Sequence, residues 1–225
     1  MKDLTVIIPI YNEEKSIKET IDSINRHINC EILAINDCST DNTLKILKSL
    51  KRKNKNLKII SKKINKGYGA ALKTGFLNTK TKFLGFLDAD LTYHPKYIPR
   101  LLNLIKKDNL DCAWCNRYGG KFNEMPLERK IGNKIIVLMF FIVTGKYIPD
   151  VTCGERVFKK KAMMRLSPKT LPNGLDMISA LSKRIVSRKL RYKIIPCDYA
   201  NREGSSKLNV VKDFINMIRN VFFER

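Results

Sequence analysis

Residues 82–95 read KFLGFLDADLTYHP, an apolar run that ends in two aspartates, Asp88 and Asp90. The run is typical of a strand that is covered on both faces of a sheet. In extended backbone the two carboxylates, which are separated only by Ala89, point to the same side. Burying two adjacent carboxylates without a partner is costly. We therefore expect a chemical role for the pair, with capping of the next helix by Asp90 as the structural alternative.

The alternation of apolar strands and amphipathic helices continues on both sides of this stretch. Strands are predicted over residues 4–10, 30–37, 57–63, 82–90 and 110–118. Helices are predicted over residues 13–28, 39–50, 67–78 and from Pro95 onward. This spacing predicts an α/β fold with a mainly parallel sheet and helices on both faces. Ligands of such sheets bind outside the carboxyl ends of the strands, where Asn36, Asp37, Asp88, Asp90 and Arg117 are expected to converge.

The second half of the sequence is less regular. We predict a helix over 126–147, a short strand and helix over 153–166, a helix over 174–189 and a strand over 191–201. A basic loop, REGSSK, then precedes an amphipathic helix over 208–224. Because no linker, repeat or low-complexity tract interrupts the chain, we expect a single domain over residues 1–225.

The charge balance predicts an anionic partner. Lysine and arginine number 44 against 21 acidic residues, a formal net charge of +23, which suits nucleic acid, a phosphorylated substrate or an anionic membrane surface. Nucleic-acid binding is a remote alternative, because aromatic residues are not interleaved with the basic ones. The longest apolar run, 135–143, would span only about 14 Å of a hydrocarbon core about 30 Å thick. With no signal peptide at the N-terminus, we expect a cytoplasmic protein.

The spacing of the cysteines and glycines argues against disulfides, a C-x-x-C metal or redox site and a glycine-rich phosphate-binding loop. The six cysteines are dispersed, and we expect reduced thiols. Cys112 and Cys115 have C-x-x-C spacing but no second pair, so we expect them in the core. The stretch KGYGAALKTG lacks the third glycine of a dinucleotide fingerprint, and no phosphate-binding P-loop occurs. A bound metal can hold a ligand's phosphates instead, and Asp88 and Asp90 suit Mg²⁺ or Mn²⁺.

Seven short motifs occur in a recognisable order. They are VIIPIYNEE (6–14), AINDCSTDNT (34–43), NKGYGAALKTG (65–75), DADLTYHP (88–95), CNRY (115–118), DVTCGERVFKK (150–160) and NREGSSKL (201–208). This succession resembles the family 2 glycosyltransferases with the GT-A (Rossmann-like) fold. Within that family it is most similar to the dolichol-phosphate mannose synthase group and related polyprenyl-phosphate glycosyltransferases.

The resemblance implies roles for individual residues. It implies that a nucleotide sugar is bound by Pro9, Tyr11, Asn12, Glu13, Ile35, Asp37, Lys66, Asp88, Ala89, Asp90, Arg202 and Lys207. Asp88 and Asp90 would hold Mg²⁺ or Mn²⁺. The acceptor phosphate would be bound by Arg117, Arg129 and Asn133, because guanidinium groups bind phosphate bidentately. The implied catalytic residues are Asp90, Arg117 and Arg129.

The implied reaction is inverting, metal-dependent transfer of a hexose from a donor of the GDP-mannose or UDP-glucose type to a polyprenyl or dolichyl phosphate. Residues 1–119 would bind the nucleotide sugar, and residues 120–225 would bind the acceptor and carry interfacial helices. A lipid phosphate is already anionic and needs only positioning. The alternative acceptor, a hydroxyl of a soluble or surface glycan, needs a carboxylate base, for which Glu155 or Asp176 are candidates.

Some positions depart from the family pattern. Asn36 and Cys38 replace an acidic residue and a glycine, Thr92 replaces Ser or Gln, and Glu155 stands where an aromatic residue is common. We expect Glu155 to pair with a lysine rather than to contact sugar hydroxyls. Residues 134–148 and the helix over 208–224 would contact a membrane, giving a peripheral protein on the cytosolic face, with ordinary core packing as the alternative for both segments.

Overall fold

The computed structural model describes residues 1–121, 123–202 and 210–223. Its centre is a seven-stranded sheet with the strand order β3-β2-β1-β4-β6-β5-β7. The strands are β1 (Leu4–Ile10), β2 (Glu31–Asn36), β3 (Leu57–Ser61), β4 (Phe83–Phe86), β5 (Cys112–Asn116), β6 (Arg156–Lys159) and β7 (Tyr192–Pro196). All neighbours pair in parallel except β6, which is antiparallel to β4 and to β5. The predicted mainly parallel sheet is confirmed.

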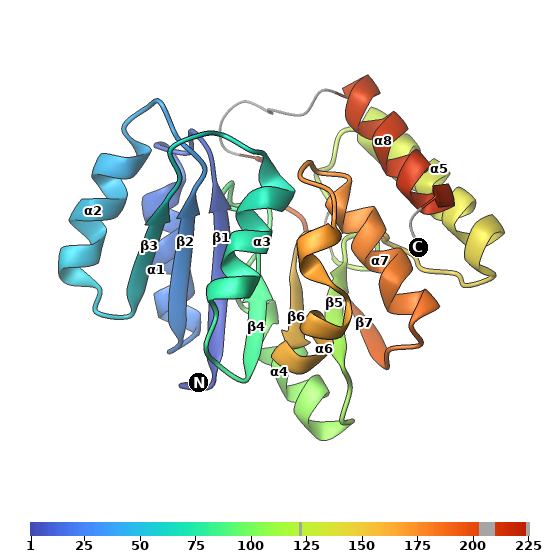
Figure 1. Ribbon diagram of the computed structural model, residues 1–225, viewed down its shortest axis with the longest axis horizontal. Coiled ribbons are helices and arrows are strands. Elements are labelled where there is room, and N and C mark those ends of the chain that lie inside the picture. The colour runs from blue at the N-terminus through green and yellow to red at the C-terminus, as the bar shows by residue number, and fades with distance from the viewer. Residues whose placement is uncertain (122, 203–209, 224–225) are drawn as a thin grey trace.

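Helices cover both faces of the sheet, as the alternating pattern predicted. The α-helices are α1 (Ile17–His27), α2 (Thr43–Lys53), α3 (Tyr68–Asn78), α4 (Tyr97–Lys107), α5 (Leu127–Thr144), α6 (Lys160–Arg165), α7 (Met177–Ser187) and α8 (Val210–Phe223). In Figure 1, α1 lies behind the sheet and α3 in front of it, while α5 and α8 pack side by side at one corner. Within the described residues, none of the helices has the length and apolarity needed to span a bilayer.

The strand that carries the two aspartates ends earlier than predicted. β4 stops at Phe86, so Asp88 and Asp90 lie in the loop that follows it. The main chain turns there, because Leu91 adopts a φ of 64°, in the left-handed region that side chains other than glycine rarely enter. The loop still begins at the carboxyl end of a central strand, so the aspartates reach the edge of the sheet where a ligand is expected.

Helix α3 packs on β1 so closely that one of its residues must be glycine. A Cβ atom at Gly75 would lie 2.4 Å from Cγ2 of Ile7. We expect Gly75→Ala to lower the free energy of unfolding by about 1–3 kcal/mol, because overpacking outweighs the better helix propensity of alanine. Urea denaturation would measure this loss. In the matched control Gly132→Ala on α5, the added Cβ would meet Phe214 only at 3.8 Å, and equal stabilities of the two variants would contradict the prediction.

Candidate active site

A cavity of ≈ 470 Å³ opens at the carboxyl ends of the parallel strands, beneath helices α5, α7 and α8. Its wall contains many of the residues predicted for the site: Pro9, Tyr11, Glu13, Asp37, Asp88, Ala89, Asp90, Arg117, Arg129, Asn133 and Arg202. The structure thus brings together residues that are up to 193 positions apart in the sequence, from Pro9 to Arg202.

The two aspartates are held by neighbouring hydroxyl groups. The Tyr68 hydroxyl donates to Oδ1 of Asp88 at 2.7 Å. Oδ1 of Asp90 accepts from the backbone N–H and the hydroxyl of Thr92 at 3.2 and 2.6 Å. This contact closes a local turn and not the N-terminus of α4, which starts at Tyr97. Burial, followed by the nearby charge of Asp90, raises the pKa of Asp88 to about 7. A cation between the carboxylates would relieve this unfavourable pairing.

The surroundings of Asp88 fit a small divalent cation. A Cβ atom at Gly154 would lie 2.8 Å from Oδ2 of Asp88, so glycine at this position keeps the space beside that oxygen open. Carboxylate oxygens are hard ligands, as Mg²⁺ and Mn²⁺ prefer. The donor set and the space therefore fit the ion expected from the sequence.

Arg202 joins the acidic end of the cavity. Its NH2 lies 2.8 Å from Oε1 of Glu13, and its NH1 lies 3.4 Å from Oδ2 of Asp90. The guanidinium is therefore placed beside the aspartate pair, where a phosphate-bearing ligand would lie. Lys207, which was predicted to bind phosphate with it, lies outside the described residues.

Three predicted nucleotide-binding residues lie outside the cavity wall. Ile35 is fully buried in β2 and belongs to the hydrophobic core. Asn12 joins two loops, because its Oδ1 accepts from the backbone N–H of Thr40 at 2.7 Å. Lys66 is exposed, and its backbone N–H donates to the buried Asp37 at 3.1 Å. Contacts of these three residues with a nucleotide therefore stay predictions, and the hydrogen bonds of Asn12 and Lys66 position the loops around the cavity.

Arg117 is held by a buried carboxylate. Its Nε and NH2 each lie 2.7 Å from an oxygen of Asp150, and NH2 also donates to the hydroxyl of Thr152 at 2.7 Å. This bidentate pair is almost completely buried. Asp150 occupies the Nε and NH2 side of the guanidinium, while Arg117 still lines the cavity wall. Phosphate binding by Arg117 therefore stays a prediction.

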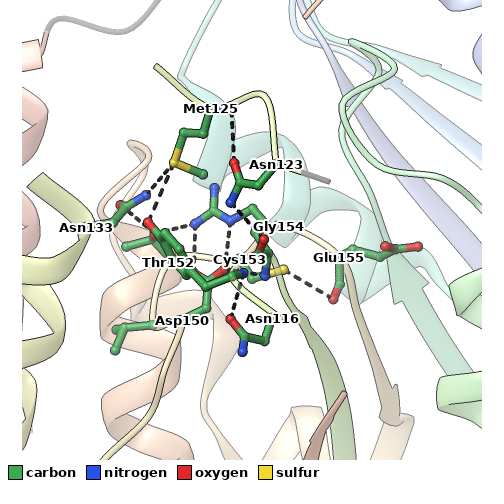
Figure 2. A network of polar contacts seen from close by, with 12 residues as sticks. Asn116, Asn123, Met125, Asn133, Asp150, Thr152, Cys153, Gly154 and Glu155 are labelled. Atoms are coloured by element: carbon green, nitrogen blue, oxygen red, sulfur yellow. Dashed lines mark hydrogen bonds and ion pairs between the residues drawn. The ribbon is translucent and has the colours of Figure 1, made fainter. Parts of the chain in front are cut away.

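The Arg117–Asp150 pair is connected to helix α5. The Thr152 hydroxyl donates to Oδ1 of Asn133 at 2.9 Å, and Nδ2 of Asn133 contacts Sδ of Met125 at 3.4 Å (Figure 2). Asn133 is thus oriented from both sides. Arg129 lies one helical turn earlier on the cavity wall, and its side chain has no ion-pair or hydrogen-bond partner in the part of the chain that the structure describes. It is a cation available for a ligand at the α5 end of the cavity.

The family model described as Glycosyl transferase family 2 matches residues 5–167, most of the chain. The chain belongs to this family. It is 30% identical over 241 residues to the UDP-N-acetylglucosamine–dolichyl-phosphate N-acetylglucosaminyltransferase of Methanococcus voltae, covering 96% of this chain and 95% of the relative. It is 32% identical over 167 residues to the dolichol-phosphate mannosyltransferase of Pyrococcus furiosus, covering 71% of this chain and 47% of that protein.

The fold of this glycosyltransferase also matches a solved structure. Glucosyl-3-phosphoglycerate synthase from Mycobacterium tuberculosis, in complex with Mn²⁺, UDP and glucosyl-3-phosphoglycerate, superposes with a TM-score of 0.74 at 16% identity. The match covers 98% of this chain and 78% of that protein. The GT-A fold expected from the motifs is confirmed.

Other residues of the glycosyltransferase site were not predicted from the sequence. Tyr68 contacts Asp88, and the Tyr93 hydroxyl accepts a hydrogen bond from the backbone N–H of Gly154 at 2.8 Å. Both tyrosines lie in quoted motifs, but nothing in their local pattern indicates these partners. Two carboxylates also line the α5 end of the cavity, Glu128 and Asp213.

The prediction that Glu155 pairs with a lysine is wrong. Glu155 is fully buried, and among the described residues neither of its carboxylate oxygens has a hydrogen-bond partner. It lies outside the cavity wall because the next residue begins β6, which is inserted into the middle of the sheet. Burial raises the pKa of its carboxyl to about 8. Asp176, the other candidate base, accepts from Nδ2 of Asn220 at 2.6 Å and also lies outside the wall.

Proposed function

We propose that this glycosyltransferase moves a hexose, with inversion, from a nucleotide-diphosphate sugar to a polyprenyl phosphate such as dolichyl phosphate. The observation that carries the proposal is the polarity of the cavity. One end is formed by the aspartates at the strand ends, and the other by Arg129 with apolar side chains of α5, α7 and α8. The names of the two dolichyl-phosphate relatives support the same class of acceptor.

The strand end of the cavity suits the donor. Tyr11 can pack on a base, and the carboxylates of Glu13 and Asp37 can accept hydrogen bonds from base or ribose. Asp88 and Asp90 would hold Mg²⁺ or Mn²⁺, which when bound neutralises charge on a departing nucleoside diphosphate. The donors that fit the proposal are GDP-mannose and UDP-glucose.

The α5 end of the cavity suits a lipid phosphate. The guanidinium of Arg129 can bind phosphate oxygens, and the oriented amide of Asn133 lies one turn farther along the same helix. Beyond them, the wall is apolar and includes Ile136, Ile178 and Met217, which can contact the first isoprene units. Because the phosphate is already anionic, these residues need only position it for attack on the anomeric carbon.

A hydroxyl acceptor is the second candidate. A hydroxyl needs a base, and Glu128 and Asp213 place carboxylates at the α5 end of the cavity. A soluble glycan acceptor would make one of these carboxylates essential, whereas a lipid phosphate would not. The Glu128→Gln and Asp213→Asn variants together separate the two acceptors: transfer that is unchanged in both favours the lipid phosphate.

The proposal is tested by incubating the purified protein with Mn²⁺ or Mg²⁺, dolichyl phosphate and labelled GDP-mannose, UDP-glucose or UDP-N-acetylglucosamine. Label that enters the organic phase with one donor would support the proposal and identify the sugar. Metal-dependent hydrolysis of the donor without labelling of the lipid would indicate that the acceptor is a soluble hydroxyl compound and not a lipid phosphate. Binding of none of the donors would contradict the donor class.

Arg129 provides a prediction for the acceptor. We expect Arg129→Gln to lower kcat/KM for dolichyl phosphate by roughly 10- to 100-fold, because a charged hydrogen bond contributes about 1.5–3 kcal/mol. The loss should lie mainly in KM for the lipid, while KM for the nucleotide sugar stays unchanged. Lys161→Gln, on the exposed side of α6, removes the same charge away from the cavity and serves as control. An equal loss in KM for both substrates would contradict the assignment.

Helices α5 and α8 carry the contact with the membrane. Most of the exposed large apolar side chains in the described region lie on or beside these helices: Leu127, Ile131, Ile135, Leu138, Phe141, Ile142, Tyr147, Ile215, Phe222 and Phe223. Exposed lysines, Lys134 and Lys146, lie among them. Such a surface on a strongly basic chain fits an anionic lipid surface, and it adjoins the cavity end assigned to the lipid phosphate.

This surface predicts a loss of vesicle binding. We expect the double variant Leu138→Glu/Phe141→Glu to sediment with anionic phospholipid vesicles at least about tenfold more weakly, because each side chain contributes about 1.5–3 kcal/mol when buried. Leu77→Glu, on α3, changes an equally exposed apolar residue outside this surface. If Leu77→Glu weakened binding as much as the double variant, the membrane contact would not lie on α5.

A further inference from the structure

Outside the cavity, three chemically reactive side chains meet in the interior of the sheet. Cys115 lies in β5, Cys197 directly follows β7, and Glu155 directly precedes β6. All three are fully buried. Their sulfur and carboxylate atoms lie within 4.8 Å of one another. These residues, here called the thiol–carboxylate cluster, have no part in the proposed transfer reaction.

The sheet holds the cluster in place. The backbone N–H of Cys115 donates to the carbonyl of Glu155 at 3.2 Å, and that of Cys197 donates to the carbonyl of Asn116 at 2.9 Å. A further buried thiol, Cys153, lies next to the thiol of Cys197. Positions fixed by three adjacent strand ends provide the preorganisation that a metal site needs.

The Glu155 carboxyl is buried beside the thiol of Cys115, a group that is only a weak hydrogen-bond donor. Neither of its oxygens has a hydrogen-bond partner within the described residues. The adjacent Arg156 does not supply one, because its guanidinium donates to the carbonyls of Cys153 and Val151 and lies over the ring of Trp114. A buried carboxylate without compensation is strongly unfavourable, and buried charges are paired or bind metals. A cation bound beside Glu155 would therefore stabilise the ionised form of this carboxyl.

We propose that Cys115, Glu155 and Cys197 bind one structural Zn²⁺ ion. Zinc accepts thiolate and carboxylate ligands at about 2.3 Å and about 2.0–2.2 Å and favours four-coordinate sites. The ligand atoms are close enough to reach such distances by side-chain rotation, and Cys153, whose thiol lies beside that of Cys197, can supply a fourth ligand. The thiols lose their protons to solvent when the ion binds, so two thiolates and one carboxylate leave the site with a net charge of −1, and a third thiolate from Cys153 makes it −2.

The ion would also stabilise the wall of the active site. Cys153 and Glu155 flank Gly154, which lies beside Asp88. Zinc bound by the cluster would therefore anchor the segment that borders the aspartate pair. It is separate from the Mg²⁺ or Mn²⁺ of the transfer reaction, because Asp88 and Asp90 offer only oxygen ligands.

Metal analysis of the full chain, together with cobalt spectroscopy, tests the proposal. The protein is purified without chelator, and a second sample is unfolded and refolded with Co²⁺. We expect about one zinc per chain, and a sulfur-to-cobalt charge-transfer absorption in the refolded sample, which Asp88 and Asp90 cannot produce. Both signals should fall at least about tenfold in Cys115→Ser and Cys197→Ser. They should persist in the matched control Cys112→Ser, a buried thiol of the same strand.

Glu155→Gln keeps the test decisive if the cysteine variants fail to fold. With zinc bound, the amide is a poorer ligand, so the variant should melt at a lower temperature than the wild type in the presence of Zn²⁺. Without a metal, glutamine replaces a carboxyl of the same size that has no hydrogen-bond partner among the described residues, so the melting temperature should not fall. A Glu155→Gln variant that melts no lower than the wild type in the presence of Zn²⁺, or a folded wild type with neither zinc nor the cobalt absorption, would overturn the proposal. Neither result depends on whether sugar transfer is observed.

Discussion

Replacement of Asp90 by asparagine is expected to reduce sugar transfer by about 10³-fold, as seen when a group that stabilises developing charge is removed. The amide oxygen can still accept the two hydrogen bonds from Thr92. The change removes one of the two charges that would hold the divalent cation. Asp88→Asn should have a similar effect, because the hydrogen bond from Tyr68 needs only an oxygen acceptor.

Asp90→Asn should fold normally, because the removal of a like charge beside Asp88 offsets the weakened 3.4 Å contact with Arg202. Circular dichroism and urea denaturation should therefore match the wild type within about 0.5–1 kcal/mol. Asp111→Asn, which changes an acidic residue at the opposite end of β5, is the matched control and should retain full activity. If Asp90→Asn retained more than about a tenth of the wild-type rate, the proposed role of the aspartates in holding a catalytic cation would be wrong.

The largest change in stability is expected for Asp150→Asn. The Arg117–Asp150 pair is almost fully buried, with side-chain exposures of 8% and 0%. Removal of one partner leaves an uncompensated buried charge, which costs about 3–5 kcal/mol. We expect a loss of this size in the free energy of unfolding, measured by urea denaturation with a fluorescence readout from Trp114.

Two comparisons test the cause of that loss. Asp22→Asn breaks the exposed pair with Lys18 and should change stability by less than about 1 kcal/mol. The double variant Arg117→Met/Asp150→Asn removes the stranded charge and should recover part of the loss. A double variant less stable than Asp150→Asn would show that packing around Arg117, and not its charge, determines the effect.

Local periodicity was sufficient to predict most elements of the fold. The runs that became β1 and β2 are almost continuously apolar, and both strands are buried in the sheet. The position of β6 could not be predicted in this way. Its four residues, Arg156–Lys159, read as a strand, but nothing in them indicates that they enter between β4 and β5. The burial of Glu155 follows from that long-range pairing, so the expectation of a surface ion pair was wrong.

In the site, too, the residues in motifs could be predicted from the sequence, whereas their partners from distant segments could not. Asp37, Asp88 and Arg202 occur in motifs, and their convergence follows from the rule that parallel strands end at one edge of the sheet. Partners that come from distant segments were not predictable. Asp150 lies 33 positions from Arg117. A sequence pattern does not reveal that the Asp150 carboxylate accepts hydrogen bonds from the Arg117 guanidinium. Whether a basic residue is free to bind a phosphate is decided by tertiary contacts.

On the ribosome, β4 and β5 emerge well before the strand that lies between them. Until synthesis passes Lys159, each of these two strands has an edge whose backbone groups will later pair with β6. Unpaired edges are templates for pairing with other chains, and incomplete sheets of this kind are prone to aggregate. A nascent chain that stalls between residues 116 and 156 therefore exposes two such edges, and completion of translation through β6 closes both at once.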